Sequence, residues 1–274
     1  GSRGCPYKCT FCSWPQMLYD GKIRFRSPEK IVEEIELLIK KYGIKEIFFD
    51  DDTFTCNKNW VIKICKLIIE REIKILWSCN GRVDNVDDEM LKIMKKSGCR
   101  MIKYGVESAS QKTLDLIRKD YTIEEIKNAF KLTKKNKILI HATAMIGFPW
   151  ETKNDMKETI KFIKKLSPDT CQFSIPIPYP GTKIFEYAEK ENLLVFGRKW
   201  ENYDMSKPLL KNYNLKPEEI VKIWKRAWIS IYFSFPFILK KLKNLKNFKV
   251  LKLYLRGFVS VLIGHLRIFS KNEC

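Results

Sequence analysis

Histidine is nearly absent from this 274-residue chain, which contains only His141 and His265. His141 lies in a strand-like apolar stretch and His265 in an apolar stretch near the C-terminus, and neither has a second metal-ligating side chain at a usable spacing. A structural zinc site normally needs four nitrogen or sulfur ligands. We therefore expect both histidines to have structural roles rather than to bind a metal.

Long apolar runs and dense disulfides are missing as well. Two uncharged stretches near the C-terminus, residues 227–239 and 257–266, are both shorter than the ~20 residues that a helix needs to cross a bilayer. Nine cysteines are an odd number and too few, for this length, to form a disulfide framework. The cysteine usage therefore indicates a reducing, cytoplasmic setting.

Acidic residues are missing from most of the C-terminal region, where none occurs between Glu219 and Glu273. Residues 216–274 carry a net charge of +10, which is half of the formal charge of +20. Within residues 239–256, lysines and Arg256 interleave with leucines and phenylalanine at helical spacing, the pattern of an interfacial helix. Residues 227–269 are thus predicted to bind an anionic membrane surface, and a helical cap packed on the core is the competing interpretation. Nucleic-acid binding is disfavoured because no binding motif accompanies the charge.

Three cysteines near the N-terminus, Cys5, Cys9 and Cys12, follow the spacing C-x₃-C-x₂-C. Ordinary ferredoxin cubanes use four cysteines, and the next one here, Cys56, lies 44 residues after Cys12. Three thiolates on one loop can hold three corners of a [4Fe–4S] cluster and leave the fourth iron open. An open iron suggests catalysis, while zinc or a plain electron-transfer cluster is the weaker alternative.

The segment from Ser27 to Pro180 alternates between helix-period and strand-like stretches, which predicts an α/β fold. Strands are expected at 44–49, 73–79, 99–106, 138–146 and 170–177, with helices between and after them. Alternation at this pace indicates right-handed βαβ units and a parallel sheet. We predict a partial (β/α)₆ barrel with its first strand upstream of Gly1, since no strand is apparent before the cysteine loop. A core over residues 1–200 would precede a basic helical extension over residues 201–274.

Charged or glycine-containing motifs follow four of the predicted strands, and sites lie at the carboxyl ends of strands in barrels of this kind. Asp50, Asp51 and Asp52 follow the first strand, with Asp50 and Asp52 expected on one face. Such a cluster of like charges is costly unless a cation sits there, although a solvated loop is the simpler interpretation. Arg82 follows the second strand and can hold a carboxylate in bidentate fashion, or lie on the surface.

The third and fourth strands end in two further motifs. Glu107 and Ser108 follow the third strand, where Glu107 either accepts hydrogen bonds from hydroxyl groups or caps the next helix. Ile146 and Gly147 end the fourth strand, and glycine there permits close approach of the backbone to a ligand.

Together these motifs resemble the radical S-adenosylmethionine (SAM) superfamily over about two thirds of the chain. The resemblance is carried by Cys5–Cys12 with Phe11 before the last cysteine, and by Asp-Asp-Thr-Phe, Gly-Val-Glu-Ser and Pro-Tyr-Pro-Gly-Thr. It is nearest to the branch with an upstream cobalamin-binding domain, which includes methyltransferases and oxidative cyclases acting on tetrapyrroles and lipids. Trp150 stands where this family usually has a glycine, so the turn after Gly147 is altered.

The resemblance implies cofactors and roles for the predicted site residues. Cys5, Cys9 and Cys12 would hold a [4Fe–4S] cluster with SAM at the fourth iron, and cobalamin would be bound by an upstream domain. The aspartates would hold the amino group of SAM, Arg82 its carboxylate, Glu107 and Ser108 the ribose, and Ile146 and Gly147 the adenine.

The function expected from this resemblance is radical modification of an apolar lipid- or tetrapyrrole-like substrate, by methylation or cyclisation, with an external electron donor. The enzyme would be cytoplasmic or bound at the inner face of the membrane. The alternative is a non-catalytic iron–sulfur or zinc module that binds membrane or RNA through its basic tail.

Overall fold

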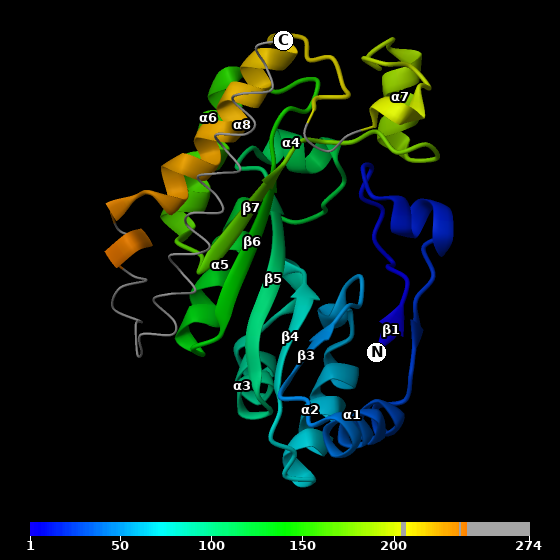
Figure 1. Ribbon diagram of the computed structural model, residues 1–274, viewed down its shortest axis with the longest axis vertical. Coiled ribbons are helices and arrows are strands. Elements are labelled where there is room, and N and C mark those ends of the chain that lie inside the picture. The colour runs from blue at the N-terminus through cyan, green and yellow to red at the C-terminus, as the bar shows by residue number, and fades with distance from the viewer. Residues whose placement is uncertain (204–206, 236, 240–274) are drawn as a thin grey trace. The chain divides into compact units, whose positions relative to one another are not determined.

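The computed structural model describes residues 1–203, 207–235 and 237–239 (Figure 1). The chain divides into two compact units, of which the first comprises Gly1–Val221 and the second begins at Lys222. The basic amphipathic pattern predicted after residue 239 lies outside the described residues, so membrane binding by this region stays a prediction. Among the helices that are described, none combines the length and the hydropathy required to cross a bilayer.

A five-stranded parallel sheet forms the centre of the first unit, which confirms the predicted α/β fold and partial barrel. Its strands are β3 (Glu46–Phe49), β4 (Leu76–Gly81), β5 (Cys99–Glu107), β6 (Leu139–Met145) and β7 (Thr170–Ser174). Each strand pairs with the one before it in the chain, in the order β3-β4-β5-β6-β7. All five carboxyl ends therefore lie at one edge of the sheet, the edge where the predicted motifs follow the strands.

Helices precede, connect and follow these strands. They are α1 (Pro28–Tyr42), α2 (Lys58–Glu70), α3 (Asp88–Lys96), α4 (Gln111–Leu116), α5 (Ile123–Lys135), α6 (Lys153–Leu166), α7 (Lys183–Lys190) and α8 (Pro217–Tyr232). Their starts follow capping rules: the Ser27 side chain accepts a hydrogen bond from Lys30 N at 3.3 Å, with Pro28 in the first turn. Thr122 and Glu125 form a capping box at the start of α5.

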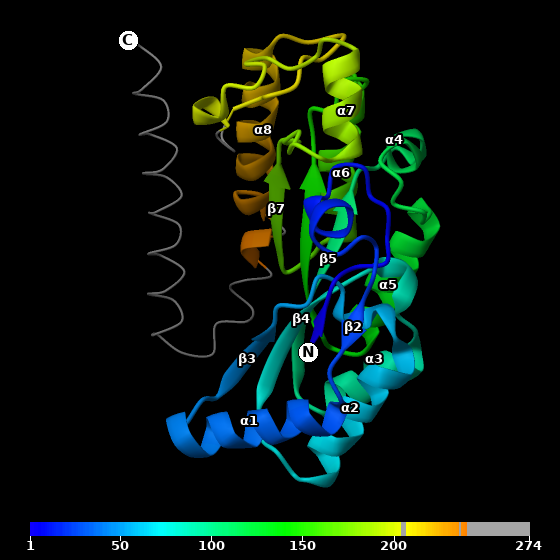
Figure 2. The same ribbon diagram turned by 90° about the vertical axis from the view of Figure 1, so that its right-hand side faces the viewer.

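The two faces of the sheet differ in what covers them. Because right-handed crossovers between sequential strands place their helices on one face, that face is apolar and fully buried, as Ile102, Tyr104 and Ala142 illustrate. The N-terminal segment lies beside the other face, where Figure 2 shows it in front of the strands. In Figure 1, α5 and α6 lie on one side of β5–β7 and the N-terminal segment on the other.

The N-terminal segment contains two short elements that the sequence did not predict. Ser2–Arg3 (β1) pairs antiparallel with Arg24–Phe25 (β2), so the expectation of no strand before the cysteine loop was wrong. A single turn of π-helix, Trp14–Leu18, follows the loop. Pieces of two and five residues are too short to produce a period in the sequence.

Candidate active site

The cysteine loop, Cys5–Cys12, is fixed to the sheet edge by backbone hydrogen bonds on both sides. Thr10 N donates to the carbonyl of Ile117 at 3.0 Å, and the carbonyl of Thr10 accepts from Ile184 N at 3.0 Å. Cys5 and Cys9 are buried and Cys12 is partly exposed. The loop is thus held between the end of α4 and the start of α7, segments far apart in the sequence.

One side chain, Gln16 in the π-helix, strengthens this attachment. Its Nε2 donates to the carbonyls of Cys9 at 2.9 Å and Cys12 at 2.8 Å, and lies 3.3 Å from that of Thr10. Its Oε1 accepts from Lys183 N at 2.9 Å, at the first residue of α7. The side-chain amide of Gln16 therefore links the backbone between Cys9 and Cys12 to the start of α7.

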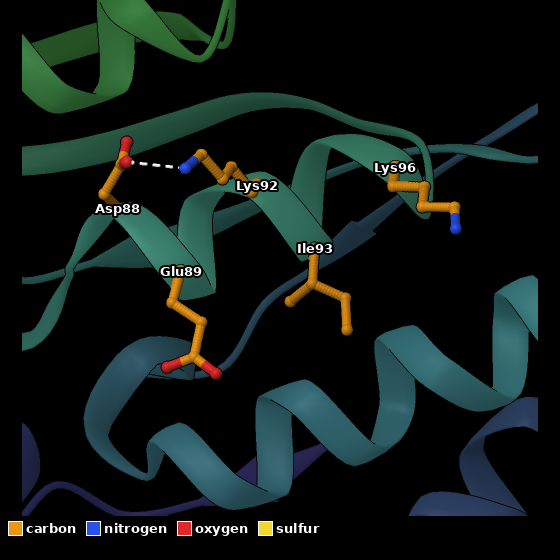
Figure 3. Close-up of a pocket in the computed structure, with 5 residues that line it drawn as sticks. All are labelled: Asp88, Glu89, Lys92, Ile93 and Lys96. Carbon is orange, nitrogen blue, oxygen red and sulfur yellow. Dashed lines mark ion pairs between the residues drawn. The ribbon is translucent and has the colours of Figure 1, made fainter.

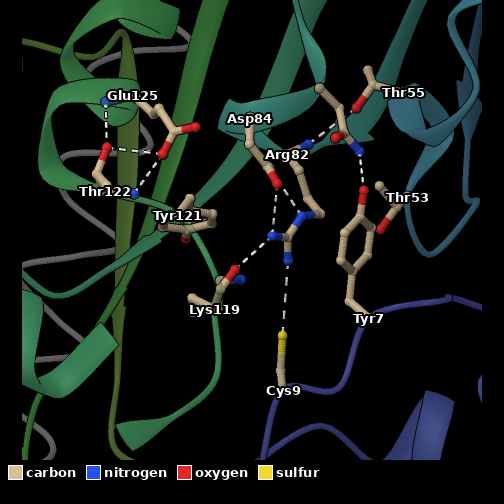
Figure 4. Close-up of polar contacts among 12 residues, drawn as sticks. Tyr7, Cys9, Thr53, Thr55, Arg82, Asp84, Lys119, Tyr121, Thr122 and Glu125 are labelled. Atoms are coloured by element: carbon tan, nitrogen blue, oxygen red, sulfur yellow. Dashed lines mark hydrogen bonds and ion pairs between the residues drawn. The ribbon is translucent and has the colours of Figure 1, made fainter. Parts of the chain in front are cut away.

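Arg82 lies at the centre of the contacts drawn in Figure 4. Its Nε and Nη2 bind the two carboxylate oxygens of Asp84 at 3.0 and 2.9 Å, and Nη2 also donates to the carbonyl of Lys119 at 2.5 Å. Its guanidinium lies 3.5 Å from the ring centroid of Tyr7, and Nη1 is 4.0 Å from Cys9 Sγ. Burial opposes the charged form, but the hydrogen bonds and the charge of Asp84 outweigh it and raise the pKa of Arg82. The arginine is thus a fixed cation beside a predicted cluster ligand.

A second buried cation, Lys119, forms an ion pair with Glu107. Lys119 Nζ lies 3.1 Å from Glu107 Oε1, and both side chains are less than a tenth exposed. Burial alone would lower the pKa of Lys119, but its neighbours Tyr121, Glu107 and Cys9 outweigh burial and raise it. Glu107 has a φ of 60°, in the left-handed region, which turns its carboxylate back over β5. Glu107, which was predicted to bind the ribose of SAM, is therefore paired here with Lys119.

The three aspartates after β3 point in different directions. Because β3 ends at Phe49, strand alternation does not extend to Asp50–Asp52 and does not set their faces. Asp51 is buried and accepts from the backbone N–H and the hydroxyl of Ser2, while Asp52 accepts from Gly4 N at 3.1 Å. Asp50 is exposed. Burial, with repulsion from Asp51 and Asp50, raises the pKa of Asp52.

The segment after β6 forms a tight buried turn. Glu151 Oε2 accepts from Gly147 N at 2.8 Å and from Phe148 N at 3.0 Å, and burial raises the pKa of Glu151 to about 7. Trp150 stacks on Phe148 with ring centroids 5.3 Å apart, so an aromatic ring occupies the place where the family usually has glycine. Ile146 is fully buried, and Gly147 has a φ of 103° that favours glycine. The Glu151 carboxylate therefore holds the backbone N–H groups of this turn.

Ser108 is fully buried between the end of β5 and the middle of α6. Its Oγ is 3.4 Å from Thr159 Oγ1 and accepts from Ser110 N at 3.1 Å. These contacts stabilise the connection into α4. The role of Ser108 toward ribose stays a prediction, as do the SAM roles of the aspartates, Arg82, Glu107, Ile146 and Gly147.

The surroundings of the loop fit an iron–sulfur cluster. Burial raises the pKa of the Cys9 thiol and raises that of Cys12 to about 11, so thiolates here need nearby positive charge. Arg82 and Lys119 supply that charge, and Thr53 Oγ1 lies 3.6 Å from Cys5 Sγ. In the described part of the chain, no three His, Cys, Asp or Glu side chains meet as at a single metal ion. A cubane binds each thiolate at a different iron, so the three cysteines suit it without meeting at one point.

The sequence of this unit identifies its family. Residues 1–163 match the radical SAM superfamily. The chain belongs to this superfamily. Over 260 residues it is 38% identical to an uncharacterized methyltransferase of Pyrococcus horikoshii, covering 95% of this chain and 56% of that protein. The predicted fold family is thereby confirmed.

Two further similarities extend this assignment. The chain is 32% identical over 213 residues to the anaerobic magnesium-protoporphyrin IX monomethyl ester cyclase of Rubrivivax gelatinosus, covering 77% of this chain and 37% of the cyclase. The fold is similar to the cobalamin-dependent radical SAM enzyme OxsB, with a TM-score of 0.68, 20% identity, and coverage of 97% of this chain and 45% of that one. The chain therefore spans roughly half, or less, of the length of these proteins. The prediction that its homologues include methyltransferases and oxidative cyclases is confirmed.

Sequence reasoning missed several residues of this radical SAM site. Gln16 and Tyr7 lie in or beside the cysteine loop, but nothing in the spacing assigns them a contact. Lys119 reaches Glu107 because Arg118 and Asp120 adopt left-handed φ values of 52° and 54°. Such a turn brings together residues 12 positions apart in a way that periodicity does not reveal.

A surface hollow elsewhere on the unit contains none of the predicted site residues. It is lined by α3 residues, namely Asp88, Glu89, Lys92, Ile93 and Lys96 (Figure 3). Lys92 pairs with Asp88 at 2.9 Å, and both side chains of this pair remain partly solvated. The hollow is a feature of the outer helical surface and is separate from the strand ends that carry the site.

Proposed function

We propose that this chain is the radical SAM core of an enzyme that holds a [4Fe–4S] cluster on Cys5, Cys9 and Cys12 and modifies an apolar, lipid- or tetrapyrrole-like substrate. The observation that carries the proposal is the attachment of the cysteine loop to the sheet edge, with two buried cations beside it. When bound, the reduced cluster and SAM supply a 5′-deoxyadenosyl radical that abstracts hydrogen from carbon.

The residues of this chain bind and orient the cofactors. Arg82 and Lys119 place positive charge beside Cys9, which compensates thiolate charge in a buried loop. We add Lys119 to Arg82 as a candidate for holding the carboxylate of SAM, with Glu107 and Ser108 toward the ribose. Asp52, with its raised pKa, would gain a counter-ion from the amino group, and the turn at Ile146–Gly147 would bind the adenine.

The reaction that follows hydrogen abstraction is proposed from the relatives. Their names describe methyltransferases and a tetrapyrrole ester cyclase, which supports methylation or cyclisation of an apolar substrate. Cobalamin would be held by a further domain of the full-length protein, and a reducing protein would supply electrons. We propose a cytoplasmic enzyme whose basic C-terminal region attaches it to the inner face of the membrane.

The test is anaerobic reconstitution of the full-length protein, followed by electron paramagnetic resonance with and without SAM and by assay of 5′-deoxyadenosine. We expect a cubane signal that SAM shifts, and 5′-deoxyadenosine as a product. Cys12→Ala should abolish both, while Cys56→Ser, a cysteine outside the loop, should retain them. A Cys12→Ala protein with intact signal and product would refute the proposal.

A further inference from the structure

A row of polar side chains crosses the open face of the sheet, opposite the apolar face that the helices cover. Asn80, Lys103, His141 and Thr170 are paired neighbours in the register of β4, β5, β6 and β7. Residues directly paired in a parallel sheet point to the same face, so the four side chains form one row. All four are half-buried, whereas Ile102 and Ile140, adjacent in sequence, are fully buried on the other face.

This row borders the candidate active site at two points. At one end, Asn80 Nδ2 donates to the carbonyl of Asp51 at 2.9 Å. Further along β5 on the same face is Gly105, where an added Cβ would collide with the Glu107 carboxylate and lie 3.1 Å from Lys119 Nζ. The row therefore lies next to the buried Lys119–Glu107 ion pair, on the side of the sheet that faces the N-terminal segment.

The charge of the row is uncompensated. Lys103 forms no ion pair within the described ranges, in contrast to Lys58 and Lys92 on the outer helices, which each pair with a carboxylate. Next to it, His141 Nδ1 lies 2.8 Å from Thr170 Oγ1, which leaves Nε2 as the ring nitrogen available to a ligand. Burial and the charge of Lys103 lower the pKa of His141, so the imidazole is neutral at neutral pH.

One positive charge, flanked by a neutral imidazole and an amide, matches a singly charged oxyanion rather than a phosphate dianion. We infer that Lys103 and His141 bind a carboxylate of the substrate, which lies across the open face of the sheet with its apolar part toward the cysteine loop. This inference rests on the proposed function and narrows the substrate class to apolar molecules that carry a carboxylate. It makes Lys103 and His141 specificity-determining residues.

The test compares a carboxylate ligand with its neutral ester. Protoporphyrin IX and its dimethyl ester share one apolar ring system, and their binding to the full-length protein can be followed by fluorescence. We expect the diacid to bind at least about tenfold more tightly than the ester, because one charge-assisted contact distinguishes them. In Lys103→Gln this ratio should fall to about one, while the affinity for the ester stays unchanged.

Two variants complete the design. Lys161→Gln removes a cation that is 76% exposed on α6, and it should leave the ratio at the wild-type value. His141→Asn should reduce the ratio by a smaller factor, since it removes a neutral hydrogen-bonding group. An unchanged ratio in Lys103→Gln, or failure of the wild type to bind either porphyrin, would overturn the inference.

A second measurement reports on the site without catalysis. The His141→Asn variant identifies the ring signal of His141 in a nuclear magnetic resonance spectrum, because that signal is lost. The diacid should shift the His141 signal and the ester should not. Iron is measured on the same samples. Protein that binds the diacid more tightly than the ester but takes up no cluster would refute the proposed function and leave the carboxylate site standing. Protein that takes up the cluster but binds the diacid and the ester equally would refute the carboxylate site and leave the proposed function standing.

Discussion

Two sets of ion pairs in this molecule are built from similar types of side chain, but one set is buried and the other is exposed to solvent. At the cysteine loop, Arg82–Asp84 and Lys119–Glu107 are largely buried. On α3 and its neighbours, Lys58 binds Asp87 and Glu89 at 2.6 Å, and these side chains are well exposed. The outer pairs have the shorter distances, so geometry alone would rank them first.

Burial reverses that ranking. An exposed ion pair gains little, because water and salt screen both charges. A buried pair has lost its hydration, so removing one partner leaves a charge with nothing to compensate it. Buried ion pairs are therefore costly to keep, and the two found here lie beside the residues expected to hold a charged cofactor.

The sharpest way to test this contrast is Lys119→Met. We expect a loss of about 3–5 kcal/mol in the free energy of unfolding, because Glu107 would stay buried without a partner. Urea denaturation measures the loss, and the double variant with Glu107→Gln should recover a large part of it. Equal losses in the single and double variants would show that the pair does not act as a unit.

Glu151 allows the cost of burying a charge to be measured as a dependence of stability on pH. Its pKa in the folded protein, about 7, lies above that of an unfolded glutamate, so its contribution is complete below pH ~4 and is lost as the pH rises through 7. The expected loss is about 3 kcal/mol for the wild type between pH 4 and pH 8. In Glu151→Gln this part of the slope should vanish, and identical slopes in the two proteins would contradict the assignment.

Gln16→Leu tests a half-buried attachment that carries no charge. Loss of the hydrogen bonds to Cys9, Cys12 and Lys183 should cost about 1–3 kcal/mol and lower the iron retained after reconstitution. Met17→Leu, an exposed neighbour in the same π-helix, is the control and should retain full iron. Equal iron in both variants would mean that the loop keeps its shape without the amide.

Glu89→Gln at the outer helix should have the smallest effect. Its carboxylate is 74% exposed, so we expect no resolvable change in Tm or in iron content. A clear decrease in Tm would show that the α3 pairs act as a network, and the contrast between the two regions would weaken accordingly.

Local patterns in the sequence predicted most of the fold. Ser27, Thr122 and Thr152 are residue types that favour the start of a helix, and each caps its helix. The five strands are apolar runs between such helices, and their order follows from short right-handed connections. The predicted motifs lie at one edge because parallel strands end together.

The contacts inside the site could not be predicted in the same way. Gln16 and Lys183 are 167 positions apart, and Arg82 meets Cys9 across 73. Such pairings depend on how elements pack, which neither propensity nor periodicity records. The cysteines were predictable because their spacing is itself local.

The attachment of Gln16 to Lys183 has a consequence for biosynthesis. Because each strand pairs with the one made just before it, the sheet can grow as the chain leaves the ribosome. The cysteines emerge before the five strands of this sheet, yet the backbone group that fixes Gln16 emerges only after β7. Iron delivered during translation would meet a loop still lacking this attachment, so cluster insertion is expected to follow completion of the sheet.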